Sequence, residues 1–210
     1  MRGVLAGKVP LIVQADGIQQ IQSAVAFAAK QKLKLIIFGG YDAPHCAALL
    51  KKYNVPVIVG GVHRLPRRRH ESYDTPFTVP ARLHEAGVKF CISGSGRFGA
   101  SMLRNLPYQA ATAAAAYGLP EREALKAITV YAADILGAQQ RLGSLKVGKD
   151  ATLLVADGDI LEIPTHVTAA YIQGRAVDLS NRHKRLYKKY QQRYQRQSDK
   201  KKRPNGAGKK

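Results

Sequence analysis

The six histidines and two cysteines of this 210-residue chain are the side chains best suited to bind a metal ion. His63 and His70 lie seven residues apart, and the basic run 67–69 between them disfavours a bound cation. The remaining histidines are isolated in the sequence and receive no role: His45, His84, His166 and His183. Cys46 and Cys91 stand in apolar surroundings without a CxxC or Cys/His spacing. This pattern predicts buried free thiols.

A glycine-rich segment offers a second kind of chemistry. Residues 94–99 read G-S-G-R-F-G, which matches GxGxxG after a predicted strand, and the backbone N–H groups of such a loop can cradle a phosphate. The match is weak, because Glu121, the nearest acidic residue at the required distance, lies at a predicted helix start. Arg97 and Arg104 favour a pocket that tolerates anions. Ser95 would need a placed base to act as a nucleophile, and the sequence names none.

Four apolar segments alternating with helical patterns must position these residues. Strands are predicted at residues 11–14, 34–38, 55–59 and 88–92, and helices at 18–30, 43–53, 81–86 and 105–117. This alternation predicts a parallel sheet with helices on its faces. The long loop at residues 63–80 contains the basic run, and its length indicates either a functional loop over a site or a mobile one. His63 follows the third strand, at the rim where barrel sites lie, although a lone loop histidine is more often solvent-facing.

The segment from residue 124 to 155 has a different plan. Four apolar residues fall on one helical face: Leu125, Ile128, Ala132 and Ile135. Gly137 stands where a left-handed C-cap belongs, so we predict one buried, capped helix. A turn at 143–149 leads to residues 151–156, predicted as a mostly buried strand, and residues 167–172 and 175–177 predict a hairpin.

This second segment resembles a known family. The ordered motifs A-I-T, A-A-D-I-L-G and R-L-G-S-L-K-V-G-K-D-A-T-L-L-V-A-D-G-D, between residues 127 and 159, resemble the C-terminal signature of the amidohydrolase superfamily, in its imidazolonepropionase-like branch. Upstream, L-I-V-Q-A-D-G resembles the fifth barrel strand of that family, L-I-I-F-G-G the sixth, and R-N-L-P-Y-Q-A-A the start of the eighth helix. The resemblance covers residues 4–187 and corresponds to the C-terminal half of the family's fold.

The resemblance implies an α/β fold with a partial (β/α) barrel. About four βα units would correspond to the second half of a TIM-type barrel, joined to a fragment of a small β-sandwich. The implied domains are a half-barrel at 1–137, partial sandwich strands at 138–180, and a basic amphipathic helix with a disordered tail at 181–210. The first four βα units of the family would be absent from the chain.

The resemblance implies the chemistry of metal-dependent hydrolases, which cleave non-peptide C–N bonds, including those of cyclic amides. A zinc or other divalent ion activates water there. Where this family places a metal-binding histidine and a catalytic aspartate, the chain has Gln14 and Ser95, and the sixth strand ends in Gly39 and Gly40 without a histidine. Neither replacement is chemically equivalent. We therefore expect no metal ligand and no cofactor in this chain, and a truncated or metal-free, inactive form.

The implied substrate pocket, for a small amide if the protein is active, lies at the rim of the sheet. Its candidate residues are Gln14, Gly39, Gly40, His63, Ser95, Arg97, Arg104 and Asn105. Open barrel edges would favour self-association.

The charge of the chain is +20, and the C-terminal segment holds much of it. Residues 181–210 contain 13 of the 34 Lys and Arg residues but a single acidic residue, Asp199. The alternative function is therefore weak binding of nucleic acid or another polyanion, with these candidates: Arg182, Lys184, Arg185, Lys188 and Lys189. An apolar stripe of Leu186, Tyr187, Tyr190 and Tyr194 is expected to pack on the body of the protein or, alternatively, to stack on bases.

Neither a signal peptide nor a membrane span is visible. Residues 1–14 lack a long apolar core, and no stretch approaches the roughly 20 apolar residues of a span. A cytoplasmic location is the default expectation.

Overall fold

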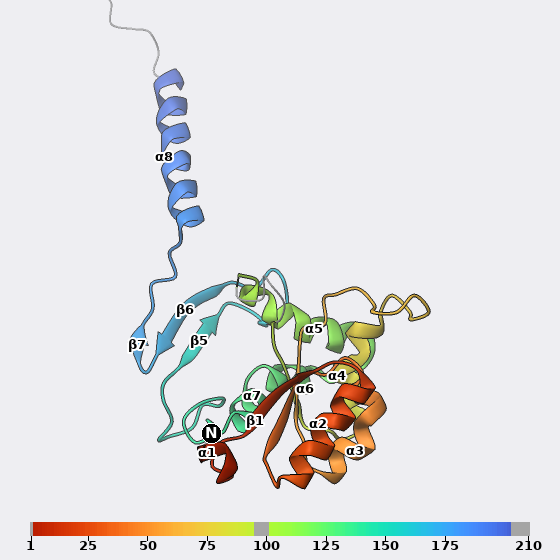
Figure 1. Cartoon of the computed structure of the whole chain (residues 1–210). Coiled ribbons are helices and arrows are strands. Elements are labelled where there is room, and N and C mark those ends of the chain that lie inside the picture. Colours follow the sequence, from red (N-terminus) through yellow and green to blue (C-terminus); the bar gives the residue numbers. More distant parts are fainter. Residues whose placement is uncertain (1, 95–100, 203–210) are drawn as a thin grey trace, which may run out of the picture.

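A parallel sheet of four strands organises the first part of the chain in the computed structural model, which describes residues 2–94 and 101–202 (Figure 1). The strands lie in sequence order: β1 (Leu11–Ala15), β2 (Leu35–Gly39), β3 (Val57–Val59) and β4 (Phe90–Ile92). Each neighbouring pair is parallel, and one register row across the sheet joins Gln14, Phe38, Ile58 and Cys91. The predicted α/β fold with a parallel sheet is confirmed.

Helices follow the strands and cover one face of this sheet (Figure 1). They are α2 (Ile18–Lys30), the 3-10 helix η1 (Ala43–Cys46) with α3 (Ala47–Lys52), α4 (Thr75–Glu85), and the 3-10 helix η2 (Leu103–Asn105) with α5 (Leu106–Tyr117). Ile21 and Val25 of α2 belong to the same buried core as Ile37 and Val57 of the sheet. The apolar residues spaced along α2 therefore form its inner face, as their helical spacing predicts.

The other face of the sheet is only partly covered. Ile36, Ile58 and Cys91 are buried against Ile135. Toward the β1 edge, Ile12 is 50% exposed. Cys46 and Cys91 are both free and buried, which confirms the prediction for the two thiols.

Helix α4 begins earlier than the sequence predicts. The prediction of a loop from 63 to 80 and a short helix at 81–86 is wrong, because α4 starts at Thr75 and contains Pro80. An interior proline costs a helix about 3 kcal/mol or more, because it lacks an N–H group and crowds the preceding turn. Here Val79 and Leu83 of the same helix are buried in the core, and this burial offsets the cost.

The single helix predicted at 124–137 is divided in two, α6 (Glu121–Ala127) and α7 (Val130–Ile135). Thr129, at φ −132° and ψ −87°, breaks the helical path, and its hydroxyl donates to the carbonyl of Leu125. Within α6 the buried face contains Ala124 and Ala127, and Leu125 is 41% exposed rather than buried as predicted. Gly137 has the predicted positive φ, 71°.

A second, antiparallel sheet contains β5 (Leu153–Ala156), β6 (Val167–Ile172) and β7 (Arg175–Ala176). The hairpin between β6 and β7 is confirmed, and both of its turn residues, Gln173 and Gly174, have positive φ. The prediction that β5 is mostly buried is wrong, because Leu154 and Val155 are about half exposed. Within the described residues this sheet has only three strands, one of them two residues long, and they leave much of its surface exposed.

Two helices remain, the short α1 (Arg2–Leu5) and the long α8 (Arg182–Lys202). Helix α8 extends away from the rest of the chain (Figure 1). Every side chain from Arg182 to Ser198 is exposed, so the tyrosine stripe does not pack on the body of the protein as expected. Residues 203–210, the end of the segment 181–210 predicted as a basic helix with a disordered tail, lie outside the described residues, and the predicted domain bounds remain a prediction. No described helix has both the length and the apolar character needed to cross a membrane.

Candidate functional site

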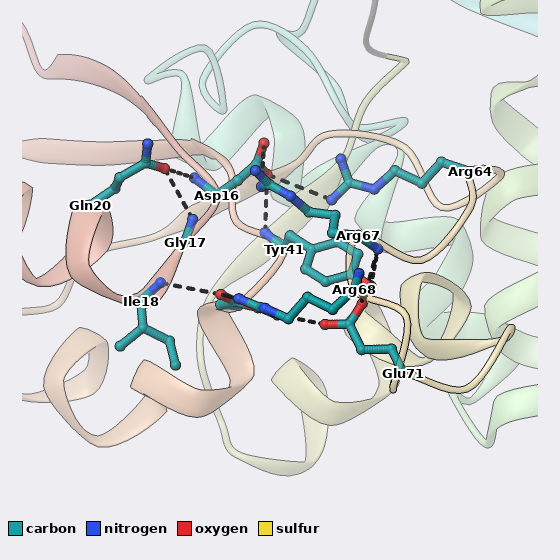
Figure 2. A network of polar contacts seen from close by, with 10 residues as sticks. Asp16, Gly17, Ile18, Gln20, Tyr41, Arg64, Arg67, Arg68 and Glu71 are labelled. Atoms are coloured by element: carbon teal, nitrogen blue, oxygen red, sulfur yellow. Dashed lines mark hydrogen bonds and ion pairs between the residues drawn. The ribbon is translucent and has the colours of Figure 1, made fainter.

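Polar side chains gather where β1, β2 and β3 end. Asp16 follows β1 directly, Tyr41 and Asp42 follow β2, and the segment after β3 contributes Arg64, Arg67, Arg68 and Glu71. Because parallel strands end at the same edge of a sheet, the three connections meet there. Figure 2 shows these side chains pointing toward one another in one network of ion pairs and hydrogen bonds, which we call the arginine–carboxylate network.

Asp16 joins the first two connections to the third. Its Oδ1 accepts a hydrogen bond from the backbone N–H of Tyr41 at 3.2 Å, and its Oδ2 lies 3.2 Å from Arg67 Nη1. Arg64 Nη2 lies 3.6 Å from Oδ1. Gly39 permits this approach, because a Cβ there would lie 2.8 Å from Asp16 Oδ1 and the φ of +105° is strained for other residues.

Asp42 is the buried member of the network, with only 2% of the residue exposed. Arg68 holds it with two hydrogen bonds, Nη1 to Oδ1 at 3.0 Å and Nη2 to Oδ2 at 2.5 Å. The backbone N–H of Ile18, in the first turn of α2, donates to Oδ2 at 3.2 Å. Hydrogen bonding by Arg68 lowers the pKa of Asp42, against the opposing effect of burial. The carboxylate therefore stays ionised and is satisfied by this chain alone.

Glu71 ties the segment after β3 to Tyr41. The Tyr41 hydroxyl donates to Oε2 at 2.6 Å, and the backbone N–H groups of Arg67 and Arg68 donate to the same oxygen at 2.9 and 3.0 Å. Burial raises the pKa of Glu71, but the hydrogen bonds from Tyr41 and Arg68 outweigh it and lower that pKa to about 2. Burial and the bond to Glu71 raise the pKa of Tyr41. The guanidinium of Arg64 lies over the Tyr41 ring, 4.7 Å from its centroid, in a cation–π contact.

His63 is turned toward the helices. Its Nε2 is 2.9 Å from Thr112 Oγ1 on α5, and its ring meets Phe77 of α4 edge to face at 6.2 Å between centroids. Burial lowers the pKa of His63, which favours the neutral ring. The next bond inward runs from the Val62 backbone N–H to Gln109 Oε1 at 2.8 Å. These contacts fasten the start of the segment to α5, and His63 is still exposed to solvent, as expected of a lone loop histidine.

The predicted pocket residues divide into three groups. Gly39 and Gly40 lie at the network edge, and Gln14 lies one register row inside it with an exposed side chain. Arg104 and Asn105 lie in η2, and neither side chain hydrogen-bonds to the network within the described ranges. The two other candidates, Ser95 and Arg97, lie outside the described residues, as does most of the glycine-rich segment.

Sequence reasoning missed all seven members of the network: Asp16, Tyr41, Asp42, Arg64, Arg67, Arg68 and Glu71. Two signals were present. Asp16 and Asp42 each come just after a predicted strand, and the basic run 67–69 follows the next strand in the chain. Acidic residues after parallel strands and a basic run after their neighbour are expected at one edge, although no spacing rule pairs a given arginine with a given carboxylate.

Comparison with known proteins agrees with this architecture. The model of the amidohydrolase family matches residues 28–180. The chain belongs to the amidohydrolase family. The chain is 28% identical over 163 residues to the imidazolonepropionase of Cupriavidus necator, and the alignment covers 78% of this chain and 36% of the relative. It is 42% identical over 77 residues to amidohydrolase tasK of Hapsidospora irregularis, 34% of this chain and 8% of the relative.

A solved structure gives the same result for the fold. The crystal structure of an amidohydrolase from Thermotoga maritima superimposes with a TM-score of 0.73 at 31% identity. The superposition covers 84% of this chain and 45% of the other. The chain therefore spans less than half the length of these relatives, several of which are imidazolonepropionases, as the resemblance predicts.

The described residues of this chain do not fit the divalent ion that the family implies. In the described ranges, no group of three or more His, Cys, Asp and Glu side chains could hold a metal. The carboxylates of Asp16, Asp42 and Glu71 already face guanidinium groups, which are permanently cationic and have no lone pair to offer a metal. A cation placed among them would meet three arginines at close range. At the ends of these strands, arginine side chains therefore pair with the carboxylates that a metal ion would need as ligands.

Proposed function

We propose that this member of the amidohydrolase family derives from a hydrolase of non-peptide C–N bonds and that its described residues do not form a metal-dependent hydrolytic centre. The parallel sheet would be part of a (β/α) barrel, with the network at its mouth. The fold and the relatives support the first half of the proposal. The arginine–carboxylate network supports the second.

The deciding observation is that arginine side chains neutralise the carboxylates of Asp16, Asp42 and Glu71 at the ends of the parallel strands. Metal-bound water is activated because the ion lowers its pKa, and carboxylate or imidazole ligands must hold the ion. In this chain Asp42 is bound by the Nη1 and Nη2 atoms of Arg68, and Asp16 lies beside Arg64 and Arg67. The permanent charge of arginine takes the place that a metal charge would have. The segment that carries these arginines is thereby fixed across the ends of β1, β2 and β3.

The first substrates to test are cyclic amides. Imidazolonepropionases are among the relatives, and an imidazolone ring contains a cyclic amide bond. The purified chain would be stripped with a chelator, supplied with zinc or manganese, and assayed on imidazolonepropionate and on simpler cyclic amides. We expect no saturable turnover and no retained metal by mass spectrometry of the desalted protein.

Two variants make this experiment decisive. Arg68→Gln frees the Asp42 carboxylate, and Asp42→Asn removes its charge while keeping nearly the same shape. Saturable turnover that a chelator removes, that added metal restores, and that Asp42→Asn abolishes would overturn the proposal. Turnover that Asp42→Asn leaves unchanged would also overturn the proposal if the desalted protein retains metal, whereas turnover without retained metal would not come from a metal centre and would support the second half of the proposal.

A further inference from the structure

Helix α8 presents a large, exposed basic surface, and near its first turn the charges of Lys184 and Arg185 act on the carboxylate of Asp178. Its first turn is capped, because Asn181 Oδ1 accepts a hydrogen bond from the backbone N–H of Lys184 at 2.9 Å. From Arg182 to Ser198 every residue is exposed, and none of the basic side chains in this range forms a salt bridge with a described residue. The charge of this helix is therefore available to a partner outside the described chain.

The basic residues of α8 are not spread evenly around the helix. Five of them follow one another at steps of three and four residues: Arg182, Arg185, Lys189, Arg193 and Arg196. At about 3.6 residues per turn these positions form one line along the helix, which we call the basic stripe, and at about 1.5 Å per residue it is roughly 21 Å long. Lys184 and Lys188 lie on a different side. The five candidates predicted from the sequence are thus divided between two surfaces.

Aromatic side chains border the basic stripe. Leu186, Tyr190 and Tyr194 follow at steps of four residues, and Tyr187 lies beside them. Tyr187 and Tyr194 are 67% and 65% exposed. A shallow groove on the helix is lined by Lys189, Tyr190, Arg193 and Arg196 together with two glutamines, so cations and an aromatic ring share one surface.

We propose that α8 binds single-stranded nucleic acid, with the basic stripe on the phosphates and the tyrosines stacked on bases. A line of cations matches a row of phosphates, and flat aromatic rings accept bases of any sequence. Glutamines at 191, 192 and 195 supply further donors without opposing charge. Helices that lie in a membrane surface bury Trp, Phe and Leu, whereas the residues that border the basic stripe are one leucine and three tyrosines with polar hydroxyl groups. The chemistry therefore favours nucleic acid over a lipid surface.

The salt dependence of binding gives the first test. The full chain would be titrated, by fluorescence anisotropy, into a labelled oligouridine and an oligothymidine of about 20 nucleotides, with an equally long DNA duplex and phosphatidylserine vesicles as further arms. Five neutralised phosphates predict a slope of about −3.5 in log affinity against log salt. Affinity for the single strands should fall roughly 100-fold between about 50 and 200 mM salt. Stronger binding to the oligouridine would identify RNA as the preferred strand, and stronger binding to the oligothymidine would identify DNA. Either preference supports the proposal.

Matched double variants test the arrangement of charge. Arg185→Gln with Lys189→Gln removes two charges from the basic stripe, and Lys184→Gln with Lys188→Gln removes two from the other side. We expect the first pair to weaken binding about tenfold and to reduce the slope by about 1.4, and the second pair to weaken it less than threefold. Equal effects of the two pairs would overturn the proposed stripe.

Tyrosine variants separate nucleic acid from membrane. Tyr190→Leu with Tyr194→Leu removes two stacking rings and adds apolar character. Binding to the single strands should weaken by about thirtyfold or more at an unchanged salt slope, because each of the two stacked bases is worth about 1–3 kcal/mol. Two results would overturn the proposal: binding to vesicles without binding to single strands, and strand binding that survives deletion of residues 182–210.

Discussion

Replacing Glu71 by glutamine should destabilise the protein at neutral pH and flatten its response to acid. The amide keeps the shape of the carboxylate and an acceptor for the Tyr41 hydroxyl and the backbone N–H groups of Arg67 and Arg68. It loses the charge that faces Arg68 Nη1 at 2.5 Å. The variant thus isolates the charge from the hydrogen-bond geometry.

The size of the effect follows from the pKa of Glu71. A carboxyl whose pKa falls from 4.5 to about 2 on folding contributes at most about 3 kcal/mol when fully ionised. The side chain of Arg68 is 41% exposed, and water screens its charge, so we expect about 1–2 kcal/mol. Because the folded pKa is lowered, this stability is complete above pH 4.5 and is lost as pH falls toward 2.

Urea unfolding, followed by circular dichroism from neutral pH down to about pH 2.5, measures this contribution directly. The wild-type free energy of unfolding should fall more steeply below pH 4.5 than that of Glu71→Gln. Glu85→Gln, at an exposed glutamate near the end of α4, is the matched control and should follow the wild type. Equal pH slopes for the wild type and Glu71→Gln, or equal stability at neutral pH, would refute the reasoning.

Three further predictions concern other parts of the chain. Gly40→Ala should lower the free energy of unfolding by about 3 kcal/mol or more, because a Cβ at this positive φ would overlap Val57 Cγ1. Gly118→Ala also lies at positive φ but in open space, so it should cost about 1 kcal/mol. Urea unfolding midpoints compare the two variants, and equal losses of stability would contradict the packing argument. Cys91 is 2% exposed, and burial raises its pKa to about 12, so it should resist a thiol reagent in the folded protein and react once urea unfolds it. Because β1 is an edge strand with Ile12 half exposed, sedimentation velocity should show concentration-dependent association that Ile12→Lys weakens, and a monomer at all concentrations would count against it.

Local pattern accounts for much of the fold. The helix at residues 18–30 was predicted with its observed bounds, and Gly118 ends α5 in the left-handed conformation that its position indicates. The hairpin turn at Gln173 and Gly174 and the two buried thiols were also readable from the sequence. These features depend on residues that are neighbours in the chain or on one apolar period. The ordered motifs between residues 127 and 159 likewise identify the family without coordinates.

Predictions failed where distant segments compete with local preference. Pro80 reads as a helix boundary, but the burial of Val79 and Leu83 carries α4 through it. The apolar period over 124–137 reads as one helix, but Thr129 interrupts it and the buried face shifts to Ala124 and Ala127. The apolar run 151–156 reads as buried, yet no described element covers Leu154 and Val155 enough to bury them.

By itself, the sequence determined the alternation of strands and helices and the family, and it predicts Gln14 and Ser95 where the family has a histidine and an aspartate. Only the tertiary structure decided that an arginine–carboxylate network lies where β1, β2 and β3 end. Asp42 and Arg68 are 26 residues apart in the chain, and they meet because β2 and β3 are parallel and end at one edge. No local period records such a pairing, since it depends on how strands are placed beside one another rather than on the residues next to either partner.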